Sequence, residues 1–293
     1  MKLRLSMRVR HFIEGYVFIS PWIIGFFLFM AVPLGRSLYY SLNELKMTKE
    51  GLVATYVGLN HYREAFTTDI EFLPLLQQTL TTMLGQVPLI MIFSIFSALL
   101  LNRPARGRIF FRGVFFMPVI IASGAILQKL LEQGAARLPI FYQYDLFGKL
   151  NQFIPGDVLE PLLKYSDSLT LVMWDSGVQI LIFLAGLQTI SASLYEAAKC
   201  DGATRWESFW KITFPMIMPM IFVNTLFSIV NSFTKADNKV MAHLMNIVFK
   251  SNNYGYGSAM GWIYFVIIFI ILGLVFLIFR KSMSTIEGRG GAH

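Results

Sequence analysis

The chain has 293 residues, of which 55% are hydrophobic and 14% are charged, and its formal net charge is +8. Because an ordinary soluble protein carries about 25% charged residues, this chain has too few polar groups to cover a water-exposed surface. The same composition excludes a disordered or fibrous chain, and the single cysteine, Cys200, excludes a disulfide framework. The remaining class is a membrane protein with several spanning helices.

Six apolar stretches are long enough to cross a bilayer, which takes roughly 20 helical residues for ~30 Å of hydrocarbon. The predicted spans are 14–40, 75–101, 111–131, 169–190, 214–233 and 259–279. The basic start before the first span is also compatible with a signal peptide, but the apolar run is too long and lacks a small-residue cleavage site. We therefore expect an uncleaved first helix and an all-α, polytopic fold.

Arginines set the expected orientation of these spans. Arg103, Arg106, Arg108 and Arg112 lie in the short segment between the second and third spans, and basic segments of this kind stay in the cytoplasm. With six spans, both termini lie on the side of this segment. The expected organisation is a cytoplasmic tail at 1–13, a transmembrane domain at 14–280 and a cytoplasmic tail at 281–293.

Motifs for several kinds of enzyme chemistry are absent from the sequence. It has no G-x-x-x-x-G-K-[ST] phosphate loop, no H-E-x-x-H zinc motif and no G-x-S-x-G nucleophile motif. The four histidines are far apart along the chain, so we expect them to be solvated or interfacial. We expect no catalytic residue, metal or cofactor in this chain.

The segment between the fourth and fifth spans, at 191–215, is here called the elbow. Ser193 with Glu196 and Thr204 with Glu207 have the spacing of helix capping boxes, and Gly202 between them suits a left-handed helix end. A plain connection needs only a few residues. Two capped helices therefore favour a docking surface over a simple linker.

The elbow also resembles a family motif. Glu196-Ala197-Ala198, Gly202, Ile212 and Phe214-Pro215 have the spacing of the EAA motif, EAA-x3-G-x9-I-x-L-P, of the membrane subunits of binding-protein-dependent ABC importers. The one departure is Phe214, where the family usually has leucine.

Other stretches are similar to carbohydrate-uptake permeases, such as the maltose and glycerol-3-phosphate transporter membrane subunits. They are 56–66, 106–118, 146–151, 183–190 and 254–260. Two features depart from that pattern: 41–74 is an ordinary-length loop without the large periplasmic insert of the maltose subunit, and 231–246 replaces a Gly-Gly-Pro-containing loop.

The resemblance implies a permease of the type I ABC importer architecture in a bacterial inner membrane, moving a sugar or oligosaccharide by alternating access. It implies a second permease subunit, two cytoplasmic ATPase subunits that bind ATP and Mg, and an extracellular solute-binding protein. It also implies an ATPase-coupling surface in the elbow, made of Glu196, Ala197, Ala198, Asp201, Gly202 and Arg205.

A polar stripe on the fifth span is the candidate cargo path. Asn224, Ser228 and Asn231 share one helical face. Because polar groups are costly in hydrocarbon, this face points into the bundle, where hydrogen bonding between helices explains it as well as a cargo path does. The resemblance to the maltose subunit favours the path. The full candidate set is Asp175, Val178, Asn224, Ser228, Asn231, Ser232 and Lys235.

Several alternatives stay open at this point. The charge of the cargo is undecided, because Lys235 and Lys239 favour an acidic sugar whereas Asp175 opposes one. The same kind of permease with a non-carbohydrate cargo, such as a glycerol phosphate, is the main rival. A stand-alone carrier and an integral-membrane enzyme are weaker ones.

Overall fold

The computed structural model describes residues 7–48, 51–102, 113, 172–235 and 237–290. These residues are mostly helical, as predicted, with one small β-hairpin. The described chain belongs to two compact units, one formed by 1–73 with 243–267 and the other by 74–242 with 268–293. The third predicted span, at 111–131, lies outside the described residues except for Gly113.

The first unit begins with a long apolar helix and continues into a small β-hairpin. Strands β1 and β2 pair antiparallel, from Asn43 opposite Tyr56 to Thr48 opposite Gly51. The hairpin was not predicted from the sequence, where 41–74 was treated as a loop. The elements of this unit are α1 (Met7–Phe26), the π-helical η1 (Phe27–Ala31), α2 (Val32–Ser41), β1 (Asn43–Thr48), β2 (Gly51–Tyr56) and α3 (Asn60–Thr67), with most of α15 (Lys239–Phe249) and the start of α16 (Tyr254–Gly290).

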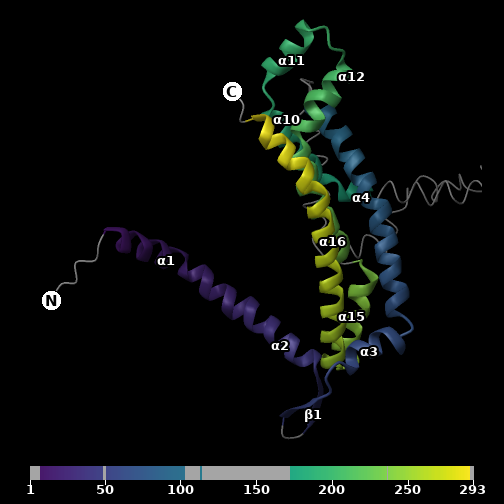
Figure 1. The fold of residues 1–293 in the computed structure, drawn as a ribbon. Coiled ribbons are helices and arrows are strands. Elements are labelled where there is room, and N and C mark those ends of the chain that lie inside the picture. The colour runs from purple at the N-terminus through teal and green to yellow at the C-terminus, as the bar shows by residue number, and fades with distance from the viewer. Residues whose placement is uncertain (1–6, 49–50, 103–112, 114–171, 236, 291–293) are drawn as a thin grey trace, which may run out of the picture. The chain divides into compact units, whose positions relative to one another are not determined.

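The second unit contains the helices that surround the elbow. Its elements are α4 (Phe72–Asn102), α10 (Gly177–Thr189), α11 (Ala192–Cys200), α12 (Arg205–Ser208), the π-helical η2 (Phe209–Thr213), α13 (Phe214–Met216) and α14 (Met218–Thr234). The chain bends by 63° between α10 and α11 and by 62° between α13 and α14. Helices α11 and α12 thus form a bent loop beyond the end of α10 (Figure 1).

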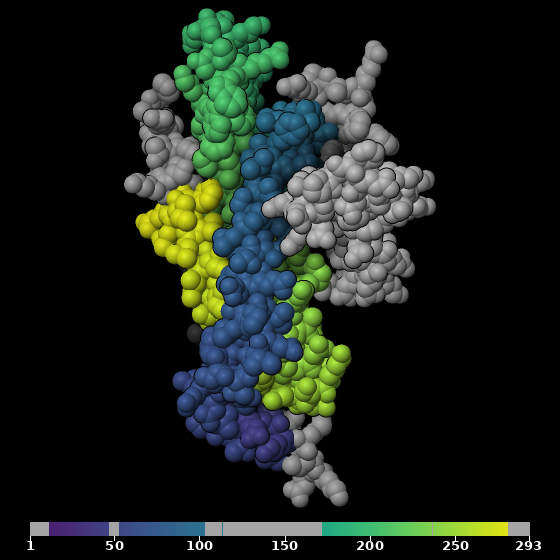
Figure 2. Space-filling view, turned by 90° about the vertical axis from the view of Figure 1, so that its right-hand side faces the viewer, coloured from purple at the N-terminus to yellow at the C-terminus, as the bar shows by residue number. Residues whose placement is uncertain are grey.

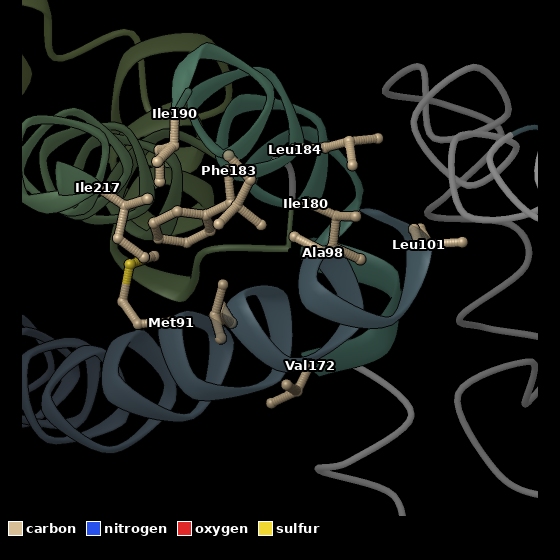
Figure 3. Packing of buried hydrophobic residues seen from close by; sticks show 11 residues of the cluster. Met91, Ala98, Leu101, Val172, Ile180, Phe183, Leu184, Ile190 and Ile217 are labelled. Atoms are coloured by element: carbon tan, nitrogen blue, oxygen red, sulfur yellow. The ribbon is translucent and has the colours of Figure 1, made fainter. Parts of the chain in front are cut away.

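The apolar core of the second unit joins α4 to α10 and to the bend before α14 (Figure 3). Phe183, Ile180 and Ile217 are fully buried, and Ala98 of α4 packs into the same cluster. Helices α10 and α14 approach closely, because a Cβ atom on Gly186 would come within 2.6 Å of Cγ of Met220. This packing positions both bends of the elbow.

Three of the predicted membrane spans, at 14–40, 75–101 and 259–279, correspond to single long helices in the described chain. Three helices are long and apolar enough to cross a bilayer: Phe12–Ser41, Phe72–Asn102 and Tyr254–Arg280. The count rises to five if α10 with α11 and α12–α13 with α14 are each one bent span. Large apolar side chains such as Phe18 (90% exposed) and Ile92 (67% exposed) face outward on these helices. Such exposure is typical of a surface in contact with lipid or with another apolar subunit.

Candidate functional site

Helix α11 forms the first half of the elbow, and its N-terminal cap differs from the predicted one. The hydroxyl of Ser191 accepts a hydrogen bond from the backbone N–H of Ser193 at 3.4 Å, so Ser191 is the cap residue and the helix begins at Ala192. The predicted capping box of Ser193 with Glu196 is therefore wrong by two residues. A cap must have extended backbone geometry, which Ser191 adopts with φ −62° and ψ 135°.

The end of α11 has the predicted left-handed glycine. Gly202 has φ +77°, its N–H donates to the carbonyl of Lys199, and the N–H of Ala203 donates to the carbonyl of Ala198. This pair of hydrogen bonds is a Schellman motif, which fixes the turn between α11 and α12. No other atom lies within 4 Å of a Cβ placed on Gly202, so the surface there is open.

The second half of the elbow starts with the predicted capping box. The N–H of Glu207 donates to Oγ1 of Thr204 at 3.2 Å, and the N–H of Thr204 donates to Oε2 of Glu207 at 2.9 Å. The hydrogen bonds from the backbone and hydroxyl of Thr204, with the charge of Lys211, lower the pKa of the Glu207 carboxyl. The carboxylate thus stays charged and keeps the helix start in place at neutral pH.

Exposed side chains cover the elbow. Glu196, Ala197, Asp201, Gly202 and Arg205 are exposed, while Ala198 is partly buried. The structure thus places Glu196, Ala197 and Ala198 on α11, Asp201 and Gly202 in the turn that follows, and Arg205 at the start of α12. Beside them lies an aromatic cluster formed by Trp206, Phe209, Trp210 and Phe214, in which neighbouring ring centroids are 5.1–6.4 Å apart.

Two contacts connect the elbow to the core. The hydroxyl of Tyr195 on α11 lies 2.8 Å from the hydroxyl of Thr213 in η2, which ties the two halves of the elbow together. Tyr195 and Ile212 also pack against the buried cluster that contains Phe183. These contacts join the elbow to the buried cluster that contains residues of α10 and the bend before α14.

The predicted polar stripe on α14 divides into two parts. Asn224 and Ser228 are 0% and 2% exposed, and both bond to Gln179 of α10. Nε2 of Gln179 donates to the hydroxyl of Ser228 at 2.8 Å, and Nδ2 of Asn224 donates to the backbone carbonyl of Gln179 at 3.2 Å. These contacts join two helices. By contrast, Asn231 and Ser232 are half-buried.

An ion pair that the sequence did not anticipate lies at the end of this stripe. Nζ of Lys235 is 3.4 Å from Oδ2 of Asp175 and 3.7 Å from Oδ2 of Asp237. The side chains of Lys235 and Asp175 are each 17% exposed. Val178, the remaining candidate, is half-buried on α10, one turn from Asp175.

A cavity of about 200 Å³, here called the polar cavity because most of its lining residues are of polar types, lies between α4 and the segment that joins α14 to α15. Its wall includes two predicted residues, Ser232 and Lys235, and a set that the sequence did not assign to the cargo path. This second set is Gln78, Thr79, Thr82, Met83, Gln86, Asp237, Asn238 and Lys239. Figure 2 shows the blue surface of α4, which supplies half of this wall. The polar positions of α4 recur every four residues, a signal that a helical-face search would have detected.

His61 and His243, two histidines of the first unit, contact other residues of the protein rather than being solvated. His61 is buried, and Nε2 of His243 lies 3.0 Å from Oδ2 of Asp69. Nδ1 of His243 is 3.2 Å from Oε2 of Glu71, so the ring lies between two carboxylates. Among the residues that the structure describes, no group of three or more histidine, cysteine, aspartate or glutamate side chains is arranged to hold a metal ion.

Comparison with known proteins agrees with the helical membrane architecture. Residues 168–285 match the model of the family described as "Binding-protein-dependent transport system inner membrane component". The chain is 32% identical to the probable ABC transporter permease protein YesP of Bacillus subtilis (strain 168), over 97% of this chain and 94% of that protein. It is 27% identical to the multiple sugar-binding transport system permease protein MsmF of Streptococcus mutans, over 93% of this chain and 96% of that protein.

A solved structure shares the fold. A chain in the crystal structure of a bacterial alginate ABC transporter, in complex with an alginate pentasaccharide-bound periplasmic protein, superposes with a TM-score of 0.66 at 20% identity. The match covers 95% of this chain and 98% of that chain. The architecture is thus that of an ABC importer permease. This chain belongs to the family of binding-protein-dependent ABC transporter permeases and is a membrane subunit of such a transporter.

Proposed function

We propose that this permease carries a sugar or oligosaccharide into a bacterial cell as one of two similar membrane subunits. It spans the cytoplasmic membrane with both termini in the cytoplasm, and two ATPase subunits dock on its cytoplasmic face. An extracellular solute-binding protein delivers the cargo. The relatives support the cargo class, since they include permeases named for multiple sugars, arabinooligosaccharides and lactose.

The observation that carries the coupling role is the exposed, rigidly capped elbow with EAA spacing. Its exposed Ala197 and Gly202 allow a partner to approach the backbone closely, and the neighbouring Trp206 and Trp210 supply apolar contact area. ATP and Mg belong to the docked ATPase subunits in this proposal. Closure of those subunits moves the elbow, and the contacts of Tyr195 and Ile212 pass the motion to the core.

The polar cavity is the part of the cargo path that this chain supplies. Ser232 and Lys235 line it, whereas Asn224 and Ser228 hold α14 against α10 and so position that wall. Alternating access then opens this cavity first to the outside and later to the cytoplasm. A glycerol phosphate is the second candidate cargo, because an sn-glycerol-3-phosphate permease, UgpA of Agrobacterium fabrum, is 27% identical over 92% of this chain.

The coupling proposal is tested with Gly202→Asp in the complete transporter, reconstituted in liposomes with its partner permease, ATPase subunits and solute-binding protein. A charged side chain at this close approach should leave insertion into the membrane intact and abolish uptake and stimulated ATP hydrolysis. Gly202→Asn adds the same bulk without charge and tolerates the left-handed conformation, so it separates bulk from charge.

Ser284→Asp is the matched control, since it adds the same charge on the predicted cytoplasmic side outside the elbow. We expect it to transport normally. A Gly202→Asp transporter that assembles and takes up cargo at the wild-type rate would refute docking at the elbow. Uptake of radiolabelled maltotriose, lactose and glycerol 3-phosphate in the same liposomes separates the two cargo classes.

A further inference from the structure

The charge of the cargo, which the sequence leaves open, can be inferred from the ion pairs around the polar cavity. The cavity wall carries two ammonium groups, Lys235 and Lys239, and one carboxylate, Asp237. Asp175 contributes a second carboxylate through its contact with Lys235. The pairing among these four groups determines which charge remains for a ligand.

The charge of Lys235 is already compensated. Its ammonium lies within 4 Å of both Asp175 and Asp237, so these three groups together carry one net negative charge. From the sequence alone, the carboxylate of Asp175 argued against an acidic cargo. In the structure it forms an ion pair with Lys235, so its negative charge does not oppose an acidic cargo. The excess negative charge also keeps a second carboxylate from binding at Lys235.

Lys239 is different. Its Nζ contacts Oε1 of Gln78 at 3.4 Å, and no carboxylate of the described residues lies within 4 Å of it. An amide oxygen compensates an ammonium charge much less than a carboxylate does. Within the part of the cavity that the structure describes, Lys239 is thus the cation available to an anionic ligand.

The opposite wall presents neutral polar groups. Gln78, Thr82 and Gln86 follow one another at four-residue spacing on α4, which places them on one helical face. The side chains of Thr82 and Gln86 make no hydrogen bond to any residue that the structure describes. Unpartnered hydroxyl and amide groups beside a cavity are suited to the hydroxyl groups of a sugar.

We propose that this cavity binds a sugar unit that carries a carboxylate, as in a uronic acid, with Lys239 pairing with that carboxylate and α4 contacting the hydroxyls. The proposal rests on the carbohydrate function proposed above and names the class of sugar. It assigns to α4 and Lys239 a role in specificity.

The test compares an acidic and a neutral sugar of equal length, trigalacturonic acid and galactotriose. Binding to the complete transporter in lipid nanodiscs is measured by saturation-transfer NMR without the solute-binding protein, so that this protein does not filter the ligands. The wild type should bind the acidic trisaccharide about tenfold more tightly, as expected for one charge-assisted contact. Added salt should reduce this preference.

Lys239→Gln should weaken binding of the acidic trisaccharide about tenfold and leave the neutral one nearly unchanged. Lys239→Arg keeps the charge and should keep the preference. Lys250→Gln is the matched control, because it removes the same charge from an exposed residue that does not line the cavity.

Equal or tighter binding of the neutral sugar by the wild type would overturn the acidic specificity and leave the sugar importer proposal standing. A preference that persists in Lys239→Gln would overturn the assignment of Lys239. If neither trisaccharide binds and liposome uptake detects no sugar, the carbohydrate function itself fails together with this inference.

Discussion

Asp69 uses both of its carboxylate oxygens to join three segments of the first unit. Oδ1 accepts the N–H groups of Glu71 and Phe72 at 2.9 and 3.0 Å, which caps α4. Oδ2 accepts the hydroxyl proton of Tyr256 at 2.8 Å and lies 3.0 Å from Nε2 of His243. Burial acts to raise the pKa of the Asp69 carboxyl, but the hydrogen bonds from His243, Tyr256 and the backbone outweigh it and hold this pKa below 3.8.

Because the folded pKa is lowered, the ionised Asp69 stabilises the fold above its ordinary pKa, and this contribution is lost as the pH falls below about 4. Asp69→Asn should therefore lower the free energy of unfolding by about 1–3 kcal/mol at pH 7. Thermal unfolding of wild type and variant in detergent, from pH 8 to pH 3, measures the difference. It should be constant down to pH 5 and shrink below pH 4.

The His243 ring lies between the carboxylates of Asp69 and Glu71, so the comparison is repeated in a His243→Gln background, which removes the titration of the imidazole. A difference between variant and wild type that grows on acidification would contradict the assignment.

The sequence did not reveal this cluster, because His243 and Tyr256 are separated from Asp69 by 174 and 187 residues. By contrast, the left-handed Gly202 was predictable, since a helix end is set by neighbouring residues.

Helix α14 shows what periodicity can predict and what it cannot. A period of 3.6 residues correctly places Asn224, Ser228 and Asn231 on one face. It does not say what that face meets, and Gln179 of α10 turns out to bond with the first two. The hairpin β1–β2 was missed because its strands, such as Asn43–Thr48, carry polar residues typical of a loop.

Ser228 and Asn231 should consequently respond differently to truncation. Ser228→Ala removes the acceptor of the Gln179 amide, so it should lower the stability of the complex by about 1 kcal/mol with little effect on cargo selectivity. Asn231→Ala should change the uptake rate without changing thermal stability, because the half-buried Asn231 side chain makes no hydrogen bond to a described residue.

Thermal unfolding and uptake by the two variants, measured side by side in the complete transporter, separate helix packing from cargo contact. Loss of assembly by Asn231→Ala would show that this residue is also structural. A changed cargo preference in Ser228→Ala would place Ser228 on the cargo path after all.

At the scale of the whole molecule, the apolar composition predicted the membrane class and the long spans, since length and hydropathy are properties of the sequence itself. The way the charges pair was not predictable, because Lys235 and Asp175 meet only after α10 and α14 have packed together. Orientation in the membrane stays a prediction from the arginines between the second and third spans.

The single cysteine gives a direct test of that orientation and of docking together. Cys200 is exposed at the end of α11, inside the elbow. A membrane-impermeant maleimide should therefore label it in inside-out vesicles and not in right-side-out vesicles, because only a thiol facing the reagent can react. Adding the ATPase subunits should slow the labelling, since they would cover the elbow.

The control is Ser251→Cys in a Cys200→Ser background, which places an exposed thiol near the start of α16 and should be labelled from the opposite side of the membrane. Labelling of Cys200 in right-side-out vesicles would contradict the proposed orientation of the chain in the membrane. A labelling rate that does not change when the ATPase subunits are added would show that they dock elsewhere.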